Sequence, residues 1–586
     1  MSIVSIILAE NKCQDITCEP GISLLKVLQS AGVYLPAICG GNGNCGKCAV
    51  RVRDGYLPVT ASDRAYFPGS RLEEGYRLAC AAFPAEDIRV EVSETGEGDF
   101  SAVNSFDAGE ESPPGLDENL LSLEKSAESY ARRLAPDRKL SYAELLEASK
   151  LAEAQGRFFE AAAGEPEKLT VYRERGRILR ISGGPEPVYA AAVDVGTTTL
   201  ALALLDLRTG RVAARFSAVN RQREAGADVI SRIQRANDGE LPRLSRTVRE
   251  QIAEGISALC REASTEVRAL RKIAIAGNTT MMHLLLGLSC RLLGQTPFTP
   301  VTLDMVSLSG REIFDGELSC ETVVLPGIST YVGADITAGL LFAGIHKARG
   351  PALFMDIGTN GEMALAHKGK ILCAATAAGP AFEGGNIRWG TGSVPGAISR
   401  VLVRDGAWEC TTIGGRPPVG ICGSGVVDIV YQGLKTGLIQ QSGRFSKDLL
   451  PGGEISLAKT GDGRDIVFCQ KDVRELQLGK SAVRSGLDAL LNHAGLGYGD
   501  IETLYLAGGF GFNLNMESGA GIGLIPDALL PRVSLIGNSS LGGAVKFLLN
   551  PEHEETLYRI AAQSEEFSLP EDRYFSGHFI DNINFD

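Results

Sequence analysis

The chain has 586 residues, a formal net charge of −13 and 70 glycines. Its length corresponds as a prior to about three to five domains and excludes a single small binding module, and its acidic charge without a segregated basic patch argues against a nucleic-acid binder. Glycine makes up about 12% of the residues against a usual ~7%, without a Gly-X-Y period, and this favours many tight turns and phosphate-binding loops.

The N-terminal sequence predicts a cytoplasmic protein. Residues 1–12 lack the basic region and the small-residue cleavage site of a secretory signal, and no apolar run reaches the ~18 residues that a membrane helix needs. We therefore expect no membrane partner. In a reducing compartment, the cysteines of such a chain are not expected to form disulfides.

The first segment, residues 1–95, predicts a β-rich α+β domain. Short apolar runs between Gly and Pro turns predict strands at Ile3–Leu8, Ala49–Val52 and Ile88–Val92, with a helix at Ile22–Ala31. The next segment, residues 96–119, is acidic, rich in Gly, Ser and Pro, and too poor in apolar side chains to fold alone. We predict that it is a flexible linker.

Four cysteines of the first segment have the pattern of an iron–sulfur site. Cys39, Cys45 and Cys48 follow one another as C-x5-C-x2-C on a glycine-rich loop, and Cys80 lies further along the chain. Glycines on such a loop leave backbone N–H groups free to hydrogen-bond sulfides. Structural zinc usually has two C-x2-C pairs and only one is present, so iron–sulfur is favoured over zinc. At these residues the segment resembles plant- and adrenodoxin-type ferredoxins, which implies a β-grasp fold with a 2Fe–2S cluster on the four cysteines.

Residues 120–187 predict a small α/β middle domain. A capping box at Ser141–Glu144 opens a predicted helix that runs to Phe159, and Leu169–Tyr172 and Ile178–Ser182 predict two strands. We find no motif with a recognisable chemistry in this segment. A spacer or dimerisation domain is the expected role.

Residues 188–586 predict one α/β domain made of two similar halves. A strand, a Gly/Thr turn and a second strand occur at Ala190–Asp206 and again at Ala352–Leu365. Each half then has an apolar strand that runs into a glycine turn and a helix, at Ile273–Met282 and at Leu504–Leu514. Four pieces in the same order indicate an internal duplication, with the two halves facing a cleft.

The two Gly/Thr turns predict a nucleotide site. Each offers backbone N–H groups and hydroxyls to phosphate oxygens, and the turns are Asp194-Val195-Gly196-Thr197-Thr198-Thr199 and Asp356-Ile357-Gly358-Thr359-Asn360-Gly361. The aspartate at the end of each first strand is placed to hold Mg²⁺ through water. One such turn alone is most often only a turn, but two copies that head two halves favour phosphate binding.

Several other motifs favour structural interpretations. Gly41–Gly46 fits G-x-G-x-x-G but lies inside the cysteine loop, and Gly479–Ser481 resembles the end of a Walker A motif, although Arg474 stands where its first glycine is required. Neither a dinucleotide fold nor a P-loop is therefore expected. His283 on a predicted apolar helix is expected to be a hydrogen-bonded core histidine and not a metal ligand. Trp389, in a glycine-rich loop, is expected to pack within the protein, with contact to a partner as the alternative.

The domain at 188–586 resembles the superfamily of actin, sugar kinases and heat-shock chaperones (ASKHA), whose duplicated halves have an RNase H-like fold. The resemblance implies that the two turns clamp the phosphates of ATP and that Leu506–Phe510, with Gly508 and Gly509, underlies the adenosine. It also implies an acidic general base on the helix between the turns, where this chain has Asp335. A helix N-cap is an equally weighted alternative for Asp335. Asn538–Ala544 is similar to an interdomain connection, and Gly423–Gly425 to a further turn beside the nucleotide.

The order of these parts resembles one family along nearly the whole chain, the ATP-dependent reductive activators of corrinoid proteins. The resemblance implies that one electron passes from the 2Fe–2S cluster to a Co(II) corrinoid, giving Co(I), and that ATP hydrolysis is coupled to this step. A plant-type cluster has a potential near about −400 mV, and each ~59 mV by which an acceptor lies lower costs about 1.4 kcal/mol. The implied partners are a corrinoid protein of a methyltransferase system, an upstream electron donor and a second copy of the chain in a homodimer.

Three other functions are left open by the residues themselves. A small-molecule kinase with a regulatory ferredoxin domain would transfer a phosphoryl group to a sugar or a carboxylic acid. An activator of a dehydratase or ring reductase is disfavoured, because those proteins resemble short subunits that share a 4Fe–4S cluster and lack the ferredoxin domain. A non-catalytic electron-carrier scaffold would leave the duplicated turns unexplained.

Overall fold

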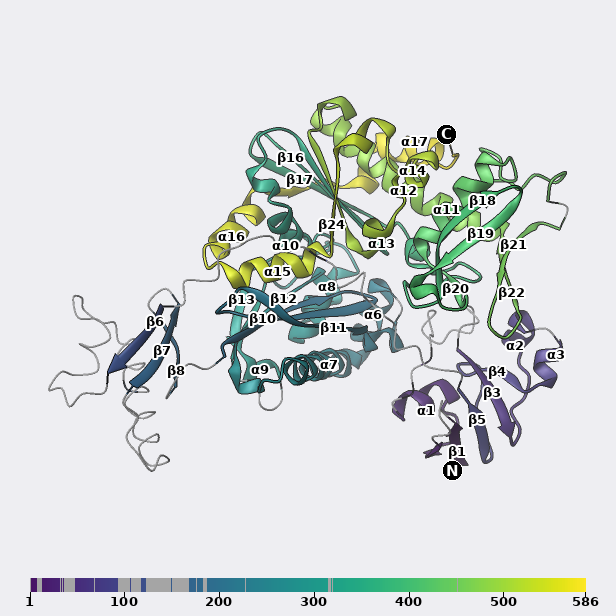
Figure 1. Ribbon diagram of the computed structural model, residues 1–586, viewed down its shortest axis with the longest axis horizontal. Coiled ribbons are helices and arrows are strands. Elements are labelled where there is room, and N and C mark those ends of the chain that lie inside the picture. The colour runs from purple at the N-terminus through teal and green to yellow at the C-terminus, as the bar shows by residue number, and fades with distance from the viewer. Residues whose placement is uncertain are drawn as a thin grey trace.

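The computed structural model describes most of the chain (Figure 1). The described residues are 2–7, 13–31, 33, 35, 48–67, 69–92, 106, 149, 187–226, 228–314, 318, 320–450 and 452–585, and the backbone alone of 117–122, 168–174 and 177–182. Cys39 and Cys45 lie outside these residues, as does the predicted helix at 141–159 apart from Ser149.

The N-terminal domain is a five-stranded sheet with the strand order β2-β1-β5-β3-β4. Strand β1 is antiparallel to β2 and parallel to β5, and Val4 and Ile6 of β1 are buried in one core with Leu24 and Leu28 of α1. The predicted strands and the predicted helix are confirmed. The edge strand β2 was not predicted, because most of its side chains are exposed and polar and give no apolar alternation. The elements are β1 (Ser2–Ile7), β2 (Cys13–Cys18), α1 (Leu24–Ser30), β3 (Ala49–Asp54), α2 (Ala61–Tyr66), α3 (Gly69–Glu73), β4 (Tyr76–Leu78) and β5 (Ile88–Glu91).

A separate three-stranded sheet follows, made of β6 (Asp117–Ser122), β7 (Lys168–Glu174) and β8 (Arg177–Ser182). All neighbouring strands are antiparallel. Strands β7 and β8 contain the two strands predicted for residues 120–187. Strand β6 begins inside the segment 96–119, so the end of the predicted linker pairs with β7.

Two six-stranded sheets, which match in the order of five strands, form the framework of the rest of the described chain. The first has the order β11-β10-β9-β12-β14-β13 and the second β24-β23-β15-β16-β17-β25. In each, three antiparallel strands in sequence are followed by a later strand parallel to the first of them, β12 beside β9 and β23 beside β15. The strands are β9 (Tyr189–Val195), β10 (Thr199–Asp206), β11 (Arg211–Val219), β12 (Leu270–Gly277), β13 (Val306–Ser309), β14 (Glu321–Val324), β15 (Ala352–Ile357), β16 (Gly361–His367), β17 (Lys370–Thr376), β23 (Thr503–Ala507), β24 (Val533–Gly537) and β25 (Ser564–Glu566).

Helices cover both sheets, and a smaller β-rich part is attached to the second sheet (Figure 1). In the described part of the chain, no helix is long and apolar enough to cross a membrane. The smaller part consists of β18 (Ala397–Arg404), β19 (Ala407–Thr412), β20 (Gly420–Ile421) and the hairpin β21 (Glu454–Lys459) and β22 (Asp465–Cys469). The helices are α6 (Val229–Arg235), α7 (Leu241–Glu262), α8 (Thr279–Leu286), α9 (Gly310–Ile313), α10 (Ala334–Ala343), α11 (Gly423–Lys435), α12 (Gln470–Ala494), α13 (Gly508–Asn513), α14 (Met516–Gly521), α15 (Ser539–Leu549), α16 (His553–Gln563) and α17 (Arg573–Asp581).

Helices α10 and α15 cross between the two sheets (Figure 1). Small residues bring their backbones together, because a Cβ on Gly543 would lie 2.0 Å from the Ala338 carbonyl oxygen and one on Gly542 would lie 2.6 Å from the Phe342 ring. Glycine is therefore required at this crossing. The crossing fixes the first turns of both helices, which belong to the site described below.

Phe106 of the predicted linker has a defined side-chain contact. The ring of Phe106 packs edge-to-face against Phe342 of α10, with centroids 6.4 Å apart, and the Arg215 guanidinium lies over it at 5.0 Å. Aromatic pairs and cation–π contacts of this kind contribute about 0.5–1.5 kcal/mol each. The segment 96–119 is therefore attached to the first half of the duplicated domain at Phe106.

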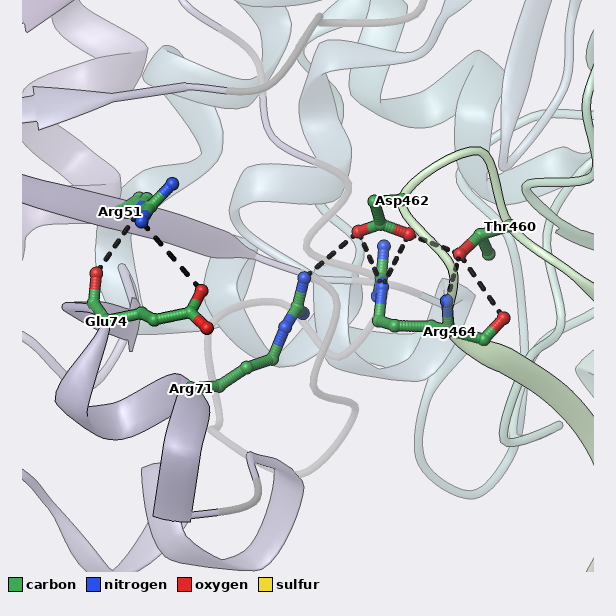
Figure 2. Close-up of polar contacts among 6 residues, drawn as sticks. All are labelled: Arg51, Arg71, Glu74, Thr460, Asp462 and Arg464. Carbon is green, nitrogen blue, oxygen red and sulfur yellow. Dashed lines mark hydrogen bonds and ion pairs between the residues drawn. The ribbon is translucent and has the colours of Figure 1, made fainter.

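A polar contact joins the N-terminal domain to the tip of the hairpin β21–β22 (Figure 2). Arg71 of α3 donates to Asp462 over 3.1 Å, and Arg464 and Thr460 hold the same carboxylate from the hairpin side. Arg71 itself lies over the Tyr76 ring at 4.1 Å, which fixes its direction. Because Asp462 is about half exposed, this ion pair is of the kind that contributes about 0–1 kcal/mol.

Candidate functional site

Two of the four predicted cluster ligands lie next to each other in the described structure. Cys48, just before β3, and Cys80, just after β4, are both buried, and the backbone N–H of Cys80 donates to the Cys48 sulfur over 3.5 Å. The β3–β4 pairing holds them there, since Ala79 N–H also donates to the Cys48 carbonyl. Hydrogen bonds from backbone N–H groups to cysteine sulfur are typical of iron–sulfur ligands. Cys39 and Cys45 lie outside the described residues, so their place relative to this pair stays a prediction.

The first Gly/Thr turn, which joins β9 to β10, is braced by side chains from three other elements. Asn220 donates to the Gly196 carbonyl over 2.8 Å, and Asn278, the N-cap of α8, donates to the Thr197 hydroxyl over 3.0 Å. The guanidinium of the fully buried Arg232 donates to the Thr197 carbonyl. This turn is therefore fixed before any ligand is considered.

Burial lowers the pKa of Arg232 to about 9. Its nearest contacts are neutral, the carbonyls of Thr197 and Gly226 and the Met281 sulfur. The residue nevertheless stays cationic near neutral pH. It places a positive charge directly behind a turn that is predicted to receive phosphate.

The aspartate that precedes the first turn is held by the start of α15. Ser540 donates to one oxygen of Asp194 over 2.7 Å, and Asn538, the cap of α15, donates to the other over 2.9 Å. Burial raises the pKa of Asp194, and these two donors act in the opposite direction. The predicted interdomain connection at Asn538–Ala544 thus contacts the predicted Mg²⁺ residue.

The second turn, which joins β15 to β16, lies opposite the first across one shared carboxylate. The hydroxyls of Thr198 and Thr359, one from each turn, both donate to Glu383 over 2.9 Å. Within the second turn, Gly358 N–H donates to the Asn360 carbonyl over 2.8 Å. The structure thus brings together the two turns that the sequence placed in separate halves.

Three further carboxyl groups lie in the same region, two of them near Asp194 and the third near those two. They are Asp335 in the first turn of α10, Asp356 at the end of β15 and Glu362 at the start of β16, and each is largely buried with part of its surface open. Burial and the neighbouring acids raise the pKa of Asp335 and of Asp356 to about 7 and that of Glu362 well above its usual range. In the described part of the chain, no lysine or arginine is close enough to lower these three pKa values. Such a group of acids fits a bound cation.

The segment at Leu506–Phe510 backs this acidic group. Gly508 has φ +83°, and a Cβ there would lie 2.5 Å from an Asp356 carboxylate oxygen. Phe510 packs against Phe382 with ring centroids 4.7 Å apart. A Cβ on Gly423 would lie 1.8 Å from the Phe382 carbonyl oxygen, so the turn at Gly423–Gly425 packs directly against Phe382.

Three family models match the chain. A 2Fe–2S iron–sulfur cluster binding domain matches residues 9–85, the RACo middle region matches 189–348, and the C-terminal domain of RACo, the ASKHA domain, matches 350–586. The last two coincide with the two halves of the duplicated domain, and the region that the family calls its middle is therefore the first half of residues 188–586. The middle domain predicted at 120–187 is a different segment.

The corrinoid activation enzyme RamQ of Eubacterium limosum is 30% identical to the chain over 97% of each protein. A solved structure titled reductive activator for corrinoid, iron–sulfur protein aligns with 99% of this chain and 98% of its own, at 30% identity and a TM-score of 0.72. The chain belongs to the family of reductive activators of corrinoid proteins. The Co(II) methylated amine-specific corrinoid protein reductase of Methanosarcina barkeri is 27% identical over 64% of this chain and 72% of its own length.

The activator is therefore an enzyme that reduces Co(II) in a corrinoid protein, and its parts are a ferredoxin-like 2Fe–2S domain and an ASKHA domain. The family resemblance seen in the sequence is confirmed. The kinase, the dehydratase activator and the passive scaffold are set aside, because the match spans the whole chain.

One alternative for a site residue is wrong. Helix α10 begins at Ala334 with Gly333 as its N-cap, so Asp335 lies inside the first turn and does not cap the helix. Its carboxylate accepts backbone N–H groups alone within the described chain, that of Ile336 over 2.9 Å and that of Asp335 itself. This leaves most of the carboxylate available for other chemistry.

The structural interpretations of His283, Gly479–Ser481 and Trp389 are confirmed, whereas Gly41–Gly46 lies outside the described residues. His283 is buried and hydrogen-bonded on both ring nitrogens, to the Thr279 carbonyl and the Val301 N–H. Lys480 lies in the middle of α12 and donates to two carbonyls of the C-terminal segment. A P-loop lysine would instead lie at the start of a helix and face a phosphate. Trp389 packs against the core of the second half, with Arg464 over its ring at 5.2 Å.

Sequence reasoning missed Glu383 and Glu362. Glu362 directly follows the second turn, where the first copy has Leu200, so comparison of the two copies could have identified it as an added carboxylate. Glu383 lies in GPAFEGG, and no second copy of that motif marks it. Only the folded chain brings it between Thr198 and Thr359.

Proposed function

We propose that this activator couples ATP hydrolysis at the two Gly/Thr turns to the transfer of one electron from its 2Fe–2S cluster to the Co(II) corrinoid. The observation that carries the proposal is the shared contact of Thr198 and Thr359, because it sets two phosphate-binding turns from two halves against each other. The uncompensated acids beside them support a cation at the same place. Two sites in one chain, one for electrons and one for nucleotide, then serve one reaction.

Cys48 and Cys80, with Cys39 and Cys45, hold the cluster in this proposal. The buried pair and the N–H donated to the Cys48 sulfur fit a thiolate ligand set. The cluster supplies one electron at a time when bound. The fold of β3 and β4 keeps two of its ligands rigid, which limits the reorganisation that accompanies electron transfer.

The residues of the two turns and of the segment at Gly508 are assigned to different parts of the nucleotide. Gly196, Thr197, Thr198 and Thr199 of the first turn and Gly358, Thr359, Asn360 and Gly361 of the second bind the phosphates, and Gly508 and Gly509 lie beneath the adenosine. Asp194 and Asp356 hold Mg²⁺ through water, and Mg²⁺ supplies charge compensation to the phosphates. This mode is supported by the proximity of the two carboxyl groups, since Asp194 contributes to the raised pKa of Asp356.

Asp335 is the proposed general base for the attacking water. A base works best when its pKa lies near the operating pH, and burial beside Asp194 raises the pKa of Asp335 to about 7. The packing of α10 on α15 holds the residue in place. It can therefore both accept and return a proton under ordinary conditions.

The α10–α15 crossing is the proposed hinge between the halves. A nucleotide that binds one arrangement of the halves better than another shifts the balance between them, and this bias is what an uphill electron transfer needs. The named relatives act on corrinoid proteins, and we assign to this chain a corrinoid protein of a methyltransferase system, an upstream electron donor and a homodimeric assembly.

The test is anaerobic ATP turnover by the reconstituted protein with and without a Co(II) corrinoid protein, while Co(I) is followed by its visible absorbance. We expect hydrolysis to be stimulated by the corrinoid protein and Co(I) to appear. Cys48→Ser should abolish Co(I) formation, whereas the exposed Cys13→Ser in the same domain should behave as the unmodified protein. Hydrolysis that ignores the corrinoid protein, or Co(I) formation without ATP, would contradict the coupling.

A further inference from the structure

Glu383 is the point at which the two phosphate-binding turns meet. A single oxygen of its carboxylate accepts hydrogen bonds from Thr198 of the first half and Thr359 of the second, both over 2.9 Å. Its other oxygen lies so close to the second turn that a Cβ on Gly358 would be 3.2 Å away. The carboxylate therefore sits between the turns and touches both.

The backbone around Glu383 is held in place. The residue ends a short 3-10 turn, Pro380–Glu383, whose flanking residues Gly379 and Gly384 have φ +79° and +75°. A Cβ on Gly384 would lie 2.3 Å from the Thr391 carbonyl oxygen, so no other residue fits there. The preceding Phe382 is buried against Phe510 of the adenosine segment. The position of the Glu383 carboxylate is thus set by the fold.

The chemistry of the contact is that of an anion in a phosphate site. A threonine hydroxyl has one hydrogen to donate. If Thr198 and Thr359 donate to Glu383, they cannot donate to a phosphate oxygen at the same time. A carboxylate and the terminal phosphate of ATP, both negative, also repel each other at this separation.

We infer that Glu383 competes with the terminal phosphate of ATP for the hydroxyls of Thr198 and Thr359, and so sets how strongly the protein distinguishes ATP from ADP. This inference rests on the proposed nucleotide function of the two turns. Glu383 is a positioning residue, because it acts through the two threonines. ATP binding replaces both hydrogen bonds to Glu383 at once and so signals the presence of the terminal phosphate to the turn Pro380–Glu383 and, through Phe382, to Phe510. ADP, which has no terminal phosphate, leaves the contact in place.

The experiment measures the Kd of Mg²⁺ with a non-hydrolysable ATP analogue and of Mg²⁺ with ADP by calorimetry on the full chain. Glu383→Gln keeps the shape and an acceptor oxygen but removes the charge, and Glu383→Ala removes the contact. We expect both variants to bind the ATP analogue about fivefold or more tightly than the unmodified protein, while the Kd for ADP stays within about twofold. The matched control is Glu409→Gln, a surface residue of β19 that pairs with Arg404 and should change neither Kd.

A second comparison separates competition from a general change in the protein. In a Thr198→Val, Thr359→Val background the two hydroxyl donors are absent. In this background, Glu383→Gln should lower the Kd for the ATP analogue by much less than it does in the unmodified protein. Tighter binding of the analogue and of ADP to the same extent would contradict the inference, as would unchanged or weaker binding of the analogue in both Glu383 variants. If the unmodified protein binds neither nucleotide, the proposed function of the turns fails as well, and the two failures are thereby distinguished.

Discussion

The two Gly/Thr turns derive from the same pattern of residues but are supported in different ways. The first is braced by Asn220, Asn278 and Arg232, and its aspartate receives hydrogen bonds from Asn538 and Ser540. The second is held at its threonine by Glu383. No donor to the Asp356 carboxylate is found in the part of the chain that the structure describes.

This difference indicates that the copies have taken separate roles. The first turn is a fixed platform, because side chains from other elements hold two of its carbonyls, the Thr197 hydroxyl and the Asp194 carboxylate. The second turn has an aspartate whose charge is opposed by burial and by Asp335, Asp194 and Glu383. A bound cation would stabilise the aspartate of the second turn more than that of the first, because a buried charge without a partner is costly. The predictions that follow start from this asymmetry.

Asp356→Asn should have the largest effect, because it removes the charge that a cation compensates. We expect kcat for ATP hydrolysis to fall by about 10²–10³, with little loss of thermal stability, since the substitution removes a buried charge. Steady-state hydrolysis under anaerobic conditions measures the first and thermal unfolding the second. The exposed Asp527→Asn is the matched control. If Asp356→Asn lowered kcat less than Asp194→Asn does, the cation would depend more on the first aspartate than on the second, contrary to this prediction.

Gly508→Ala should come next, because its Cβ would lie 2.5 Å from an Asp356 carboxylate oxygen. We expect the displaced carboxylate to lower kcat by about 10–100-fold. Gly495→Ala is the control for backbone strain alone, since it has φ +69° and nothing within 4 Å of a new Cβ. Both variants should lose about 1–2 kcal/mol of stability. Equal hydrolysis rates in the two variants would show that contact with Asp356 is not what matters.

Ser540→Ala tests the support of the first turn. Loss of this donor leaves Asp194 with the hydrogen bond from Asn538. We expect the Mg²⁺ concentration that gives half-maximal turnover to rise about tenfold, and the protein to lose about 1 kcal/mol of stability. A Mg²⁺ titration of ATP turnover measures the first effect. Ser257→Ala, a hydroxyl of α7 that bonds only its own helix, is the control. An unchanged Mg²⁺ requirement would mean that the hydrogen bond from Ser540 to Asp194 does not contribute to Mg²⁺ binding.

The smallest effect is expected in the pH dependence of stability. The pKa of Asp356 is raised from an ordinary 3.8 to about 7 in the folded protein. Between these values the unfolded chain is ionised and the folded chain is protonated, so this group destabilises the fold as pH rises through the window, and the effect levels off above about pH 7. In EDTA, the melting temperature of Asp356→Asn relative to the unmodified protein should therefore increase from pH 5 to pH 8. A constant difference would contradict the raised pKa.

The parts of the site that the sequence predicted are those that lie on short, contiguous motifs. The turns after β9 and β15 could be found because each motif joins two strands and occurs twice. The pattern of the cluster cysteines could be recognised because a metal site imposes spacing on the chain, and the structure describes Cys48 and Cys80 of this pattern. Asp335 could be assigned only by analogy, and its alternative as an N-cap failed because α10 begins at Ala334, two residues before the helix that Asp335 would cap.

The parts that could not be predicted depend on contacts between distant segments. Glu383 meets Thr198, which is 185 residues away, and Ser540 meets Asp194 over 346 residues. No local pattern encodes such a pairing. The edge strand β2 and the extension of β6 into the predicted linker were missed for another reason, because Cys13–Cys18 and residues 117–119 are mostly polar in sequence and give no apolar alternation.

The contact of Phe106 with Phe342 also limits where the electron can be delivered. Whatever path the chain takes from Val92, at the end of the ferredoxin-like domain, to Phe106, it can span at most about 50 Å, because an extended chain advances no more than about 3.6 Å per residue. The domain is thus confined to a small volume around one face of the first half, at a local concentration on the order of millimolar. Within such a volume even a weak ion pair such as Arg71 with Asp462 is frequently formed. We therefore expect the corrinoid protein to receive its electron near the part of the surface that the tethered domain can reach.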